Sequence, residues 1–302
     1  MIHDKSTTRN RAWRRLSFAC FLAWGLPAWS QGPPATDIFL ADLQIESGRL
    51  QVAEPVNVTN RAGYDNQPAF LPDGTALLYT SIREDGQADT YRYHLTDSTI
   101  TRVTRTRESE YSPTPLCDGR HFSVVRVELD STQRLWQFPL GGGAPSLLLS
   151  DVQPVGYHAW GTPDLVALFV LGNPNSLQIA DLRTGQSRRV AERVGRSLHK
   201  IPGEAAFSFV HKVAEDTWWL KRVTFETHAI TSLIRTLPGR EDYAWMPDGV
   251  VLMARDVTLY KWQPEVDEDW VVVADLAGYG LKGITRLAVS PKGDKLALVS
   301  AR

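Results

Sequence analysis

The chain has 302 residues, of which 43% are hydrophobic and 22% are charged, and it contains 22 glycines and 18 prolines. Such proportions indicate a well-packed protein that is rich in turns. The 33 Lys and Arg residues are balanced by 34 Asp and Glu residues. A chain without a basic excess is poorly suited to hold phosphate backbones, so nucleic acid is not expected as a partner.

The first 30 residues predict a secretory signal peptide. Four arginines at positions 9, 11, 14 and 15 precede an apolar core at 16–24, and Ala28-Trp29-Ser30 places small residues at the cleavage positions. The apolar run is shorter than the ~20 residues that span a bilayer, so we expect no transmembrane anchor after the signal is removed. The mature chain would begin at Gln31 and be periplasmic or secreted.

Removal of this segment changes the charge and the cysteine count. It takes away five basic residues and one acidic residue, which leaves 28 against 33 and a net charge of −5. Cys117 would then be the sole cysteine, so no intrachain disulfide is expected.

Two strand-like segments follow the predicted signal peptide, at 37–43 and 49–52. They correspond to the third and fourth strands of a repeat. They precede the first repeated phrase of the chain, so they stand outside any complete repeat.

A short phrase then recurs through the chain: an apolar residue, a turn resembling Pro-Asp-Gly, and a run of β-forming residues. Its fullest copies are Phe70-Leu71-Pro72-Asp73-Gly74 and Trp245-Met246-Pro247-Asp248-Gly249. The third residue of each copy lies at 72, 117, 162, 202, 247 and 291, with spacings of 45, 45, 40, 45 and 44. Proline and glycine in this order favour a tight turn, and a fixed period of this size is typical of repeat proteins.

Each repeat contains two further strand-like segments. The third strand is clearest at 90–95, 135–140, 177–182, 218–223 and 259–262, and a short fourth strand follows each copy. Four antiparallel strands in about 45 residues predict the blade of a β-propeller.

The two ends of the chain complement each other. After the last phrase the chain has one more apolar strand, at 296–299, and lacks a third and a fourth. Pairing it with the two orphan strands completes a blade from about 277–302 and 36–56, which would leave no open sheet edge. We therefore predict an all-β, six-bladed propeller over 31–302, built of four-stranded antiparallel blades and closed by its N-terminal strands.

The first repeat resembles the TolB-type propeller family, a variant of the WD-type blade. The matching segments are Asn57-Val58-Thr59-Asn60, Tyr64-Asp65, Gln67-Pro68-Ala69-Phe70, Pro72-Asp73-Gly74, Leu78-Tyr79-Thr80-Ser81 and Asp89-Thr90-Tyr91. The similarity covers about 36–302. TolB itself carries an α/β domain before its propeller, and related peptidases carry a Gly-x-Ser-x-Gly nucleophile that this chain lacks. The resemblance therefore implies a bare propeller, which in this family mostly serves as a recognition platform.

In a propeller, the first strand of each blade lines the central channel, and the loops that enter those strands surround one mouth. The candidate binding residues therefore lie a few places before each turn phrase. They are Tyr64, Asp65, Gln67, Glu110, Tyr111, Tyr157, His158, Arg196, His199, Glu241, Asp242, Tyr243 and Arg286.

Two functions remain open at this point. The first is a monomeric scaffold that binds an envelope protein or peptide at one mouth of the channel, with no catalytic residues and no cofactor. The alternative is a metal-assisted lyase or hydrolase that acts on a small or saccharide ligand. In it His158, His199 and Glu241 would hold a divalent metal in the channel, because imidazole and carboxylate suit such ions.

Overall fold

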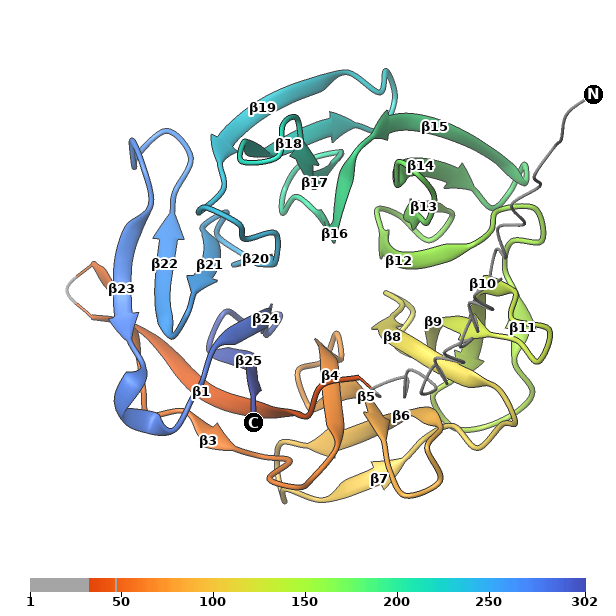
Figure 1. The fold of residues 1–302 in the computed structure, drawn as a ribbon, viewed down its shortest axis with the longest axis horizontal. Helices are drawn as coiled ribbons and strands as arrows, with labels where there is room; N and C mark the ends of the chain where they lie inside the picture. Colours follow the sequence, from red (N-terminus) through yellow and green to blue (C-terminus); the bar gives the residue numbers. More distant parts are fainter. Residues whose placement is uncertain (1–32, 47) are drawn as a thin grey trace, which may run out of the picture. The chain divides into compact units, whose positions relative to one another are not determined.

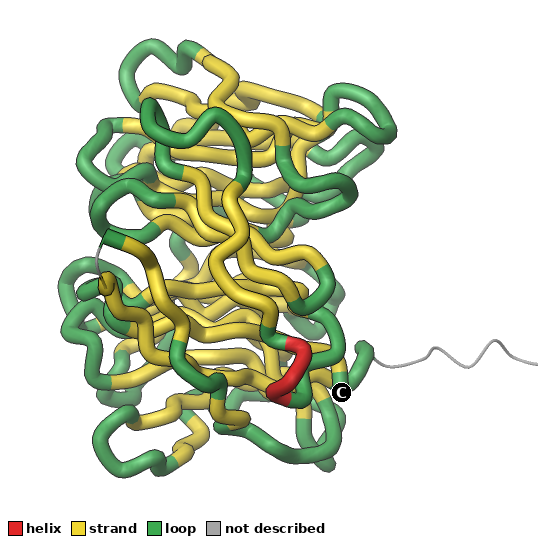
Figure 2. Tube along the Cα trace, turned by 90° about the vertical axis from the view of Figure 1, so that its left-hand side faces the viewer, coloured by secondary structure: helices red, strands yellow, loops and turns green. Residues whose placement is uncertain are grey.

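The computed structural model describes residues 33–46 and 48–302 (Figure 1). The predicted signal peptide lies outside these residues. Within them, no helix is long and apolar enough to cross a bilayer. Strands dominate, and the helical element of this part of the chain is the short 3-10 turn η1 (Ala277–Tyr279), red in Figure 2.

Four sheets each contain four consecutive antiparallel strands. The first sheet contains β8 (Ser109–Pro115), β9 (His121–Val127), β10 (Gln133–Pro139) and β11 (Ser146–Leu147), and the second contains β12 (Val155–Trp160), β13 (Leu165–Val170), β14 (Ser176–Asp181) and β15 (Gln186–Glu192). The third contains β16 (Val194–Lys200), β17 (Ala206–Lys212), β18 (Trp218–Thr224) and β19 (Ile230–Arg235). The fourth contains β20 (Tyr243–Trp245), β21 (Val251–Arg255), β22 (Thr258–Trp262) and β23 (Val271–Asp275). The predicted all-β architecture of four-stranded antiparallel sheets is thus confirmed.

A fifth, nine-stranded sheet joins the two ends of the described chain. One part runs through β4 (Tyr64–Phe70), β5 (Ala76–Ile82), β6 (Ala88–His94) and β7 (Ile100–Arg102); the other contains β24 (Ile284–Val289), β25 (Lys295–Ala301), β1 (Thr36–Glu46), β2 (Arg49–Val52) and the short β3 (Val56–Asn57).

Within this sheet, β1 pairs with β25 over seven residue positions, from Thr36 opposite Ala301 to Asp42 opposite Lys295. The two parts of the sheet meet in a single parallel pair, Thr36 opposite Tyr64. The strand order β24-β25-β1-β2 is therefore antiparallel throughout and draws on both ends of the described chain.

The turn phrase forms the tight turns that its residues favour. Gly74 has φ +71°, and its N–H donates to the carbonyl of Leu71 at 2.9 Å. The carboxylate of Asp73 accepts the N–H of Thr75 at 2.9 Å. A Cβ at Gly74 would meet no atom within 4 Å, so the backbone angle, not space, favours glycine here.

Apolar clusters fill the space between neighbouring sheets, as face-to-face packing requires. In one cluster, Leu252 and Leu259 of the β20–β23 sheet pack with Leu296 and Leu298 of β25 and with Phe39 of β1. All five are buried, and the clusters hold each sheet against the next.

One strand of each four-stranded sheet, and two strands of the nine-stranded sheet, face a common centre. These inner strands are β4, β8, β12, β16, β20 and β24 (Figure 1). They carry most of the candidate binding residues of the sequence analysis, so we expect a functional site at this centre.

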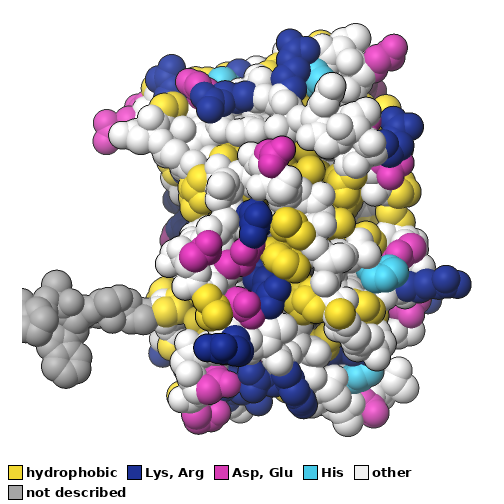
Figure 3. Space-filling view, turned by 90° about the vertical axis from the view of Figure 1, so that its right-hand side faces the viewer, with side chains coloured by type: hydrophobic (Ala, Val, Ile, Leu, Met, Phe, Trp, Pro, Cys, Tyr) yellow, Lys and Arg dark blue, Asp and Glu magenta, His cyan; other side chains and the backbone are white. Residues whose placement is uncertain are grey.

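The outer surface is different in character. Figure 3, which views the side on which β11 lies, shows Lys and Arg side chains interspersed with Asp and Glu. Ion pairs form among the charged residues of the described chain, for example between Arg134 and Glu128 at 2.6 Å. A mixed surface of this kind offers a ligand no single sign of charge to recognise.

Candidate functional site

A cavity of about 600 Å³ lies among the inner strands. Residues of all of them line it, together with residues of the turn phrases that follow. Its volume is in the range of pockets that hold small ligands or peptide segments.

The cavity opens at the turn-phrase end of the inner strands. Its exposed lining residues are Pro72, Cys117, Lys200 and Pro291, which all lie in a turn phrase or directly before one. From the sequence we expected the binding mouth at the other end of these strands, where the loops enter them, and that expectation stays a prediction.

A layer of polar side chains crosses the channel at the end away from the turn phrases. Arg286, on β24, donates from Nη2 to the hydroxyl of Tyr157, on β12, at 2.8 Å, and its guanidinium carbon lies 4.9 Å from the centre of the Tyr157 ring. These strands stand on opposite sides of the common centre in Figure 1. The contact therefore spans the channel.

Two charged residues complete this layer. Arg196, on β16, donates from Nε to Oδ1 of Asp242 at 3.1 Å and from Nη2 to Oδ2 at 2.5 Å. Arg286 Nη1 lies 3.6 Å from the same carboxylate. Burial alone would lower the pKa of Arg196, but the hydrogen bonds and charge of Asp242 outweigh it and raise that pKa. We call Tyr157, Arg196, Asp242 and Arg286 the bridging layer.

The bridging layer lies at the inner end of the large cavity. A second cavity, of about 110 Å³, shares Arg196, Asp242 and Leu287 with the first. Tyr64 and Tyr111 do not line the large cavity. Burial raises the pKa of Tyr64 to about 12, although the charge of Arg286 acts in the opposite direction.

The two histidines singled out by the sequence both line the large cavity. His158 Nε2 lies 2.6 Å from the hydroxyl of Ser123, and His199 Nε2 lies 3.2 Å from that of Ser197. Burial lowers the pKa of His158 to about 3 and that of His199 to about 4. Both imidazoles are therefore neutral at pH 7.

Glu241, the third residue of the alternative metal set, lies elsewhere. It lines the smaller cavity, where its carboxylate accepts the backbone N–H of Arg196 at 3.1 Å and pairs with Lys212 at 2.9 Å. Among residues 33–46 and 48–302, no three His, Cys, Asp or Glu side chains form a group that could hold a metal ion. The three residues are thus divided between two cavities.

Asp65 and Glu110 are fully buried and do not line either cavity. Asp65 accepts a hydrogen bond from Ser81 at 2.6 Å and pairs with Arg61 at 3.2 Å. Glu110 accepts a hydrogen bond from Thr106. Their carboxylates serve contacts inside the fold.

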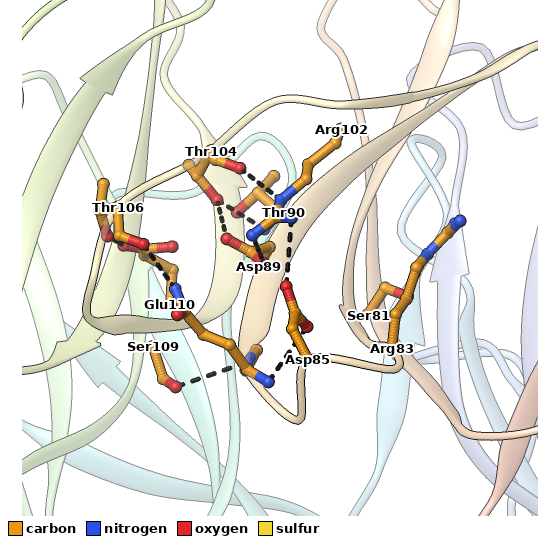
Figure 4. A network of polar contacts seen from close by, with 12 residues as sticks. Ser81, Arg83, Asp85, Asp89, Thr90, Arg102, Thr104, Thr106, Ser109 and Glu110 are labelled. Carbon is orange, nitrogen blue, oxygen red and sulfur yellow. Dashed lines mark hydrogen bonds and ion pairs between the residues drawn. The ribbon is translucent and has the colours of Figure 1, made fainter.

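Glu110 belongs to a buried acidic region between β6 and β8 (Figure 4). Asp89 pairs with Arg102 at 2.5 Å, and Thr104 donates to the same carboxylate at 3.4 Å. Burial raises the pKa of Asp89 to about 6. Burial also raises the pKa of Glu110 to about 7, and the charge of Asp89 adds to this shift.

Gln67 and Tyr243 line the large cavity, as Tyr157, Arg196, Asp242 and Arg286 do. The side-chain oxygen of Gln67 accepts the backbone N–H of Ser112 at 2.7 Å and so ties β4 to β8. The hydroxyl of Tyr243 donates to Ser208 at 2.8 Å. Both side chains are thus held in place by a neighbouring sheet.

The residues of the open mouth were not singled out by the sequence. Lys200, Pro202 and Pro291 lie in or beside turn phrases, from which we predicted tight turns and no binding residues. Trp160 and Trp245, one residue or two before a turn, also line the cavity, and each donates its indole N–H to a serine at 2.8 Å. Their repeated position before the turns is the signal that could have revealed them.

No protein-family model and no curated protein matches the sequence. Solved structures do match. A putative TolB from Agrobacterium tumefaciens has 16% identity and a TM-score of 0.70, over 88% of this chain and 99% of that one. A chain of a nidogen–laminin complex has 11% identity and a TM-score of 0.59, over 88% and 98%. An oligogalacturonate lyase in complex with manganese has 14% identity and a TM-score of 0.52, over 82% and 80%. The predicted TolB-type propeller fold is confirmed. At identities this low, the similarity supports the fold and not a shared function.

Proposed function

We propose that the chain is a TolB-like, six-bladed propeller of the periplasm or the secreted space, which binds a peptide segment of an envelope protein in its central cavity. The order β24-β25-β1-β2 supplies the sixth blade in this proposal, beside β4–β7 and the four separate sheets. The mature protein would act as a monomer without a cofactor.

The observation that carries the binding role is the shape of the cavity. It has about 600 Å³, it opens at the turn-phrase end, and its walls are mostly apolar. Pockets with apolar walls and a few placed polar groups are the usual sites of ligand and peptide recognition. A neighbour with this fold comes from a nidogen–laminin complex, which supports a role in protein binding.

The metal-assisted lyase remains the second hypothesis, and one structural neighbour is a lyase in complex with manganese. No specific contact in this chain favours it. His158 and His199 each lie beside a serine hydroxyl, and Glu241 lines the other cavity.

A photocrosslinking experiment tests the binding role. Cys117 is exposed at the open mouth and is the only cysteine between residues 31 and 302, so a benzophenone maleimide can be attached there. The matched control is Cys117→Ser with Ser187→Cys, which moves the probe to the exposed outer strand β15. We expect an envelope protein to crosslink to the probe at position 117 and not at 187. Identical crosslinks from both positions, or none from position 117, would contradict the proposal.

A further inference from the structure

Polar contacts cross the channel at the inner end of the large cavity. Arg286 and Tyr157 bridge its inner end, and the Arg196–Asp242 pair stands beside them. A chain that ran through the channel would have to break this layer. A chain end can enter from the turn-phrase mouth and stop at the layer without disturbing it.

The net charge of the cavity lining is positive. The charged residues that line the cavity are Arg196, Lys200, Arg286 and Asp242, three cations and one carboxylate. Asp242 is engaged by Arg196 through two hydrogen bonds, so it neutralises that arginine first. Because the histidines of the wall are neutral at pH 7, they neither add to this charge nor offset it.

Arg286 has hydrogen-bonding capacity to spare. A guanidinium has five N–H donors. With the described residues Arg286 makes one side-chain hydrogen bond, to Tyr157, and its distance to Asp242 is 3.6 Å. Its side chain is 15% exposed, so an anion at this position would be largely shielded from water and from salt.

The walls between the mouth and Arg286 suit apolar side chains better than sugar hydroxyls. Pro68, Pro113, Leu198, Leu287 and Val289 line them. Several polar groups of the wall are already engaged, such as the hydroxyl beside the His158 ring and the Gln67 side chain. Ser112 Oγ and His158 Nδ1 have no partner among the described residues, but both atoms are buried.

We propose that the cavity receives the carboxyl-terminal end of a peptide, with the terminal carboxylate bound by Arg286 and apolar residues packed against the walls. Capture of a terminal carboxylate is an established mode of peptide recognition, and arginine binds carboxylates through short, charge-assisted hydrogen bonds. Lys200, at the mouth, adds a second positive charge that attracts such a ligand. This inference rests on the peptide-binding function proposed above and adds the polarity and chemistry of the bound end.

Two peptide libraries test it. Both consist of N-acetylated hexapeptides of the same random composition; one ends in a free carboxylate and the other in an amide. Each is passed over the immobilised protein at low salt, and the best-retained peptide is then titrated in both forms by calorimetry. We expect retention from the free-acid library and an affinity at least about tenfold lower for the amide form, the size of one charge-assisted hydrogen bond.

Variants locate the carboxylate. Arg286→Gln should cost the acid form about tenfold or more and leave the amide form unchanged, whereas Arg286→Lys should keep part of the preference for the acid. Arg188→Gln, which removes an exposed arginine from the outer strand β15, is the matched control and should bind as the unaltered protein does. Thermal melts show which variants fold, and the comparison of acid with amide on the unaltered protein needs no variant.

Each result has a definite meaning. Equal retention of both libraries, or an unchanged acid preference in Arg286→Gln, overturns the carboxylate inference while peptide binding stands. If neither library is retained, both the inference and the proposed function fail. If tri-galacturonate binds where the peptides do not, the positively charged cavity serves an anionic saccharide, and both peptide proposals are overturned.

Discussion

Arg286 donates a hydrogen bond to the hydroxyl of Tyr157 at 2.8 Å, although the two residues are 129 positions apart in the sequence. They belong to inner strands on opposite sides of the common centre (Figure 1). The bond therefore braces the channel from within and forms the floor of the cavity.

Replacing Tyr157 by Phe should lower the free energy of unfolding by about 1 kcal/mol, because it removes one partly buried hydrogen bond to a charged donor. Urea unfolding measures the change. Tyr260→Phe is the control, since the Tyr260 hydroxyl makes no hydrogen bond within the part of the chain that the structure describes. Equal stability of the two variants would mean that the brace contributes nothing.

Replacing Asp242 by Asn should have a larger effect, about 2 kcal/mol, because it removes the carboxylate shared by two partly buried arginines. The matched control is Asp256→Asn. Asp256 also pairs with an arginine, Arg240, but its side chain is 74% exposed, and exposed pairs contribute about 0–1 kcal/mol. Denaturation in urea compares both variants; a control that loses as much as Asp242→Asn would contradict the prediction.

The buried acids beside β6 should make stability fall as pH rises. Burial raises the pKa of Glu110 from 4.5 to about 7 and that of Asp89 from 3.8 to about 6. The folded protein therefore holds these protons more tightly than the unfolded chain does. Their stabilising effect is fully present below about pH 4 and is lost as pH rises toward 7, at up to about 1.4 kcal/mol per pH unit for each group.

The test compares Glu110→Gln with the unaltered protein from pH 5 to pH 7.5. The neutral amide should flatten this decline. His158 and His199 act with the opposite sign, since their lowered pKa values make stability fall below pH 6.5. The difference between the two proteins isolates Glu110 from that contribution. Glu54→Gln, at an exposed position, should leave the profile unchanged.

The histidines themselves can be followed by NMR. Because burial lowers the pKa of His158 to about 3 and that of His199 to about 4, their ring proton shifts should stay at neutral values down to pH 5. The variants His158→Gln and His199→Gln assign the signals. A midpoint near pH 6.5 for either ring would show that it is solvated and free to take up a proton.

The turn phrase can be tested at Gly74. Alanine at φ +71° is strained, so Gly74→Ala should cost about 1–2 kcal/mol. Gly141→Ala is a control, because Gly141 lies in a turn without a left-handed φ, and a Cβ there would also meet nothing within 4 Å. Chemical denaturation should separate the two; equal losses would show that φ at Gly74 is not the constraint.

The repeated unit could be predicted because its signals are local. Proline and glycine in each turn phrase, such as Pro72 and Gly74, act on their own backbone, and the alternation of each strand reports its buried face. Such patterns can be interpreted without knowing which distant residues are in contact.

The site could be predicted only in part, because side-chain direction depends on register. The pairing of β4 with β5 shifts between Asn66 and Ala69, and that of β8 with β9 shifts between Tyr111 and Thr114. Such bulges re-aim the residues beside them. Asp65 and Glu110 thus lie on inner strands but do not line the cavity. No local sequence pattern predicts this.

The contact between Arg286 and Tyr157 could not be predicted from the sequence, for a different reason. Both residues were candidates, but their contact depends on how strands from separate sheets face each other around the centre. The position of Lys200 could not be predicted for the same reason. Its place at the mouth depends on which end of the channel forms the opening of the cavity.

The pairing of β1 with β25 has a consequence for how the molecule is made. Thr36 finds its partner in Ala301, so this sheet cannot be completed until almost the whole chain is available. Contacts between residues so distant in sequence form slowly, because the intervening chain must first be brought together. Until then, β1 presents an unpaired edge that other chains can join. Assembly of this protein should therefore end with its last strand, and the interval before that step is when it is most exposed to aggregation.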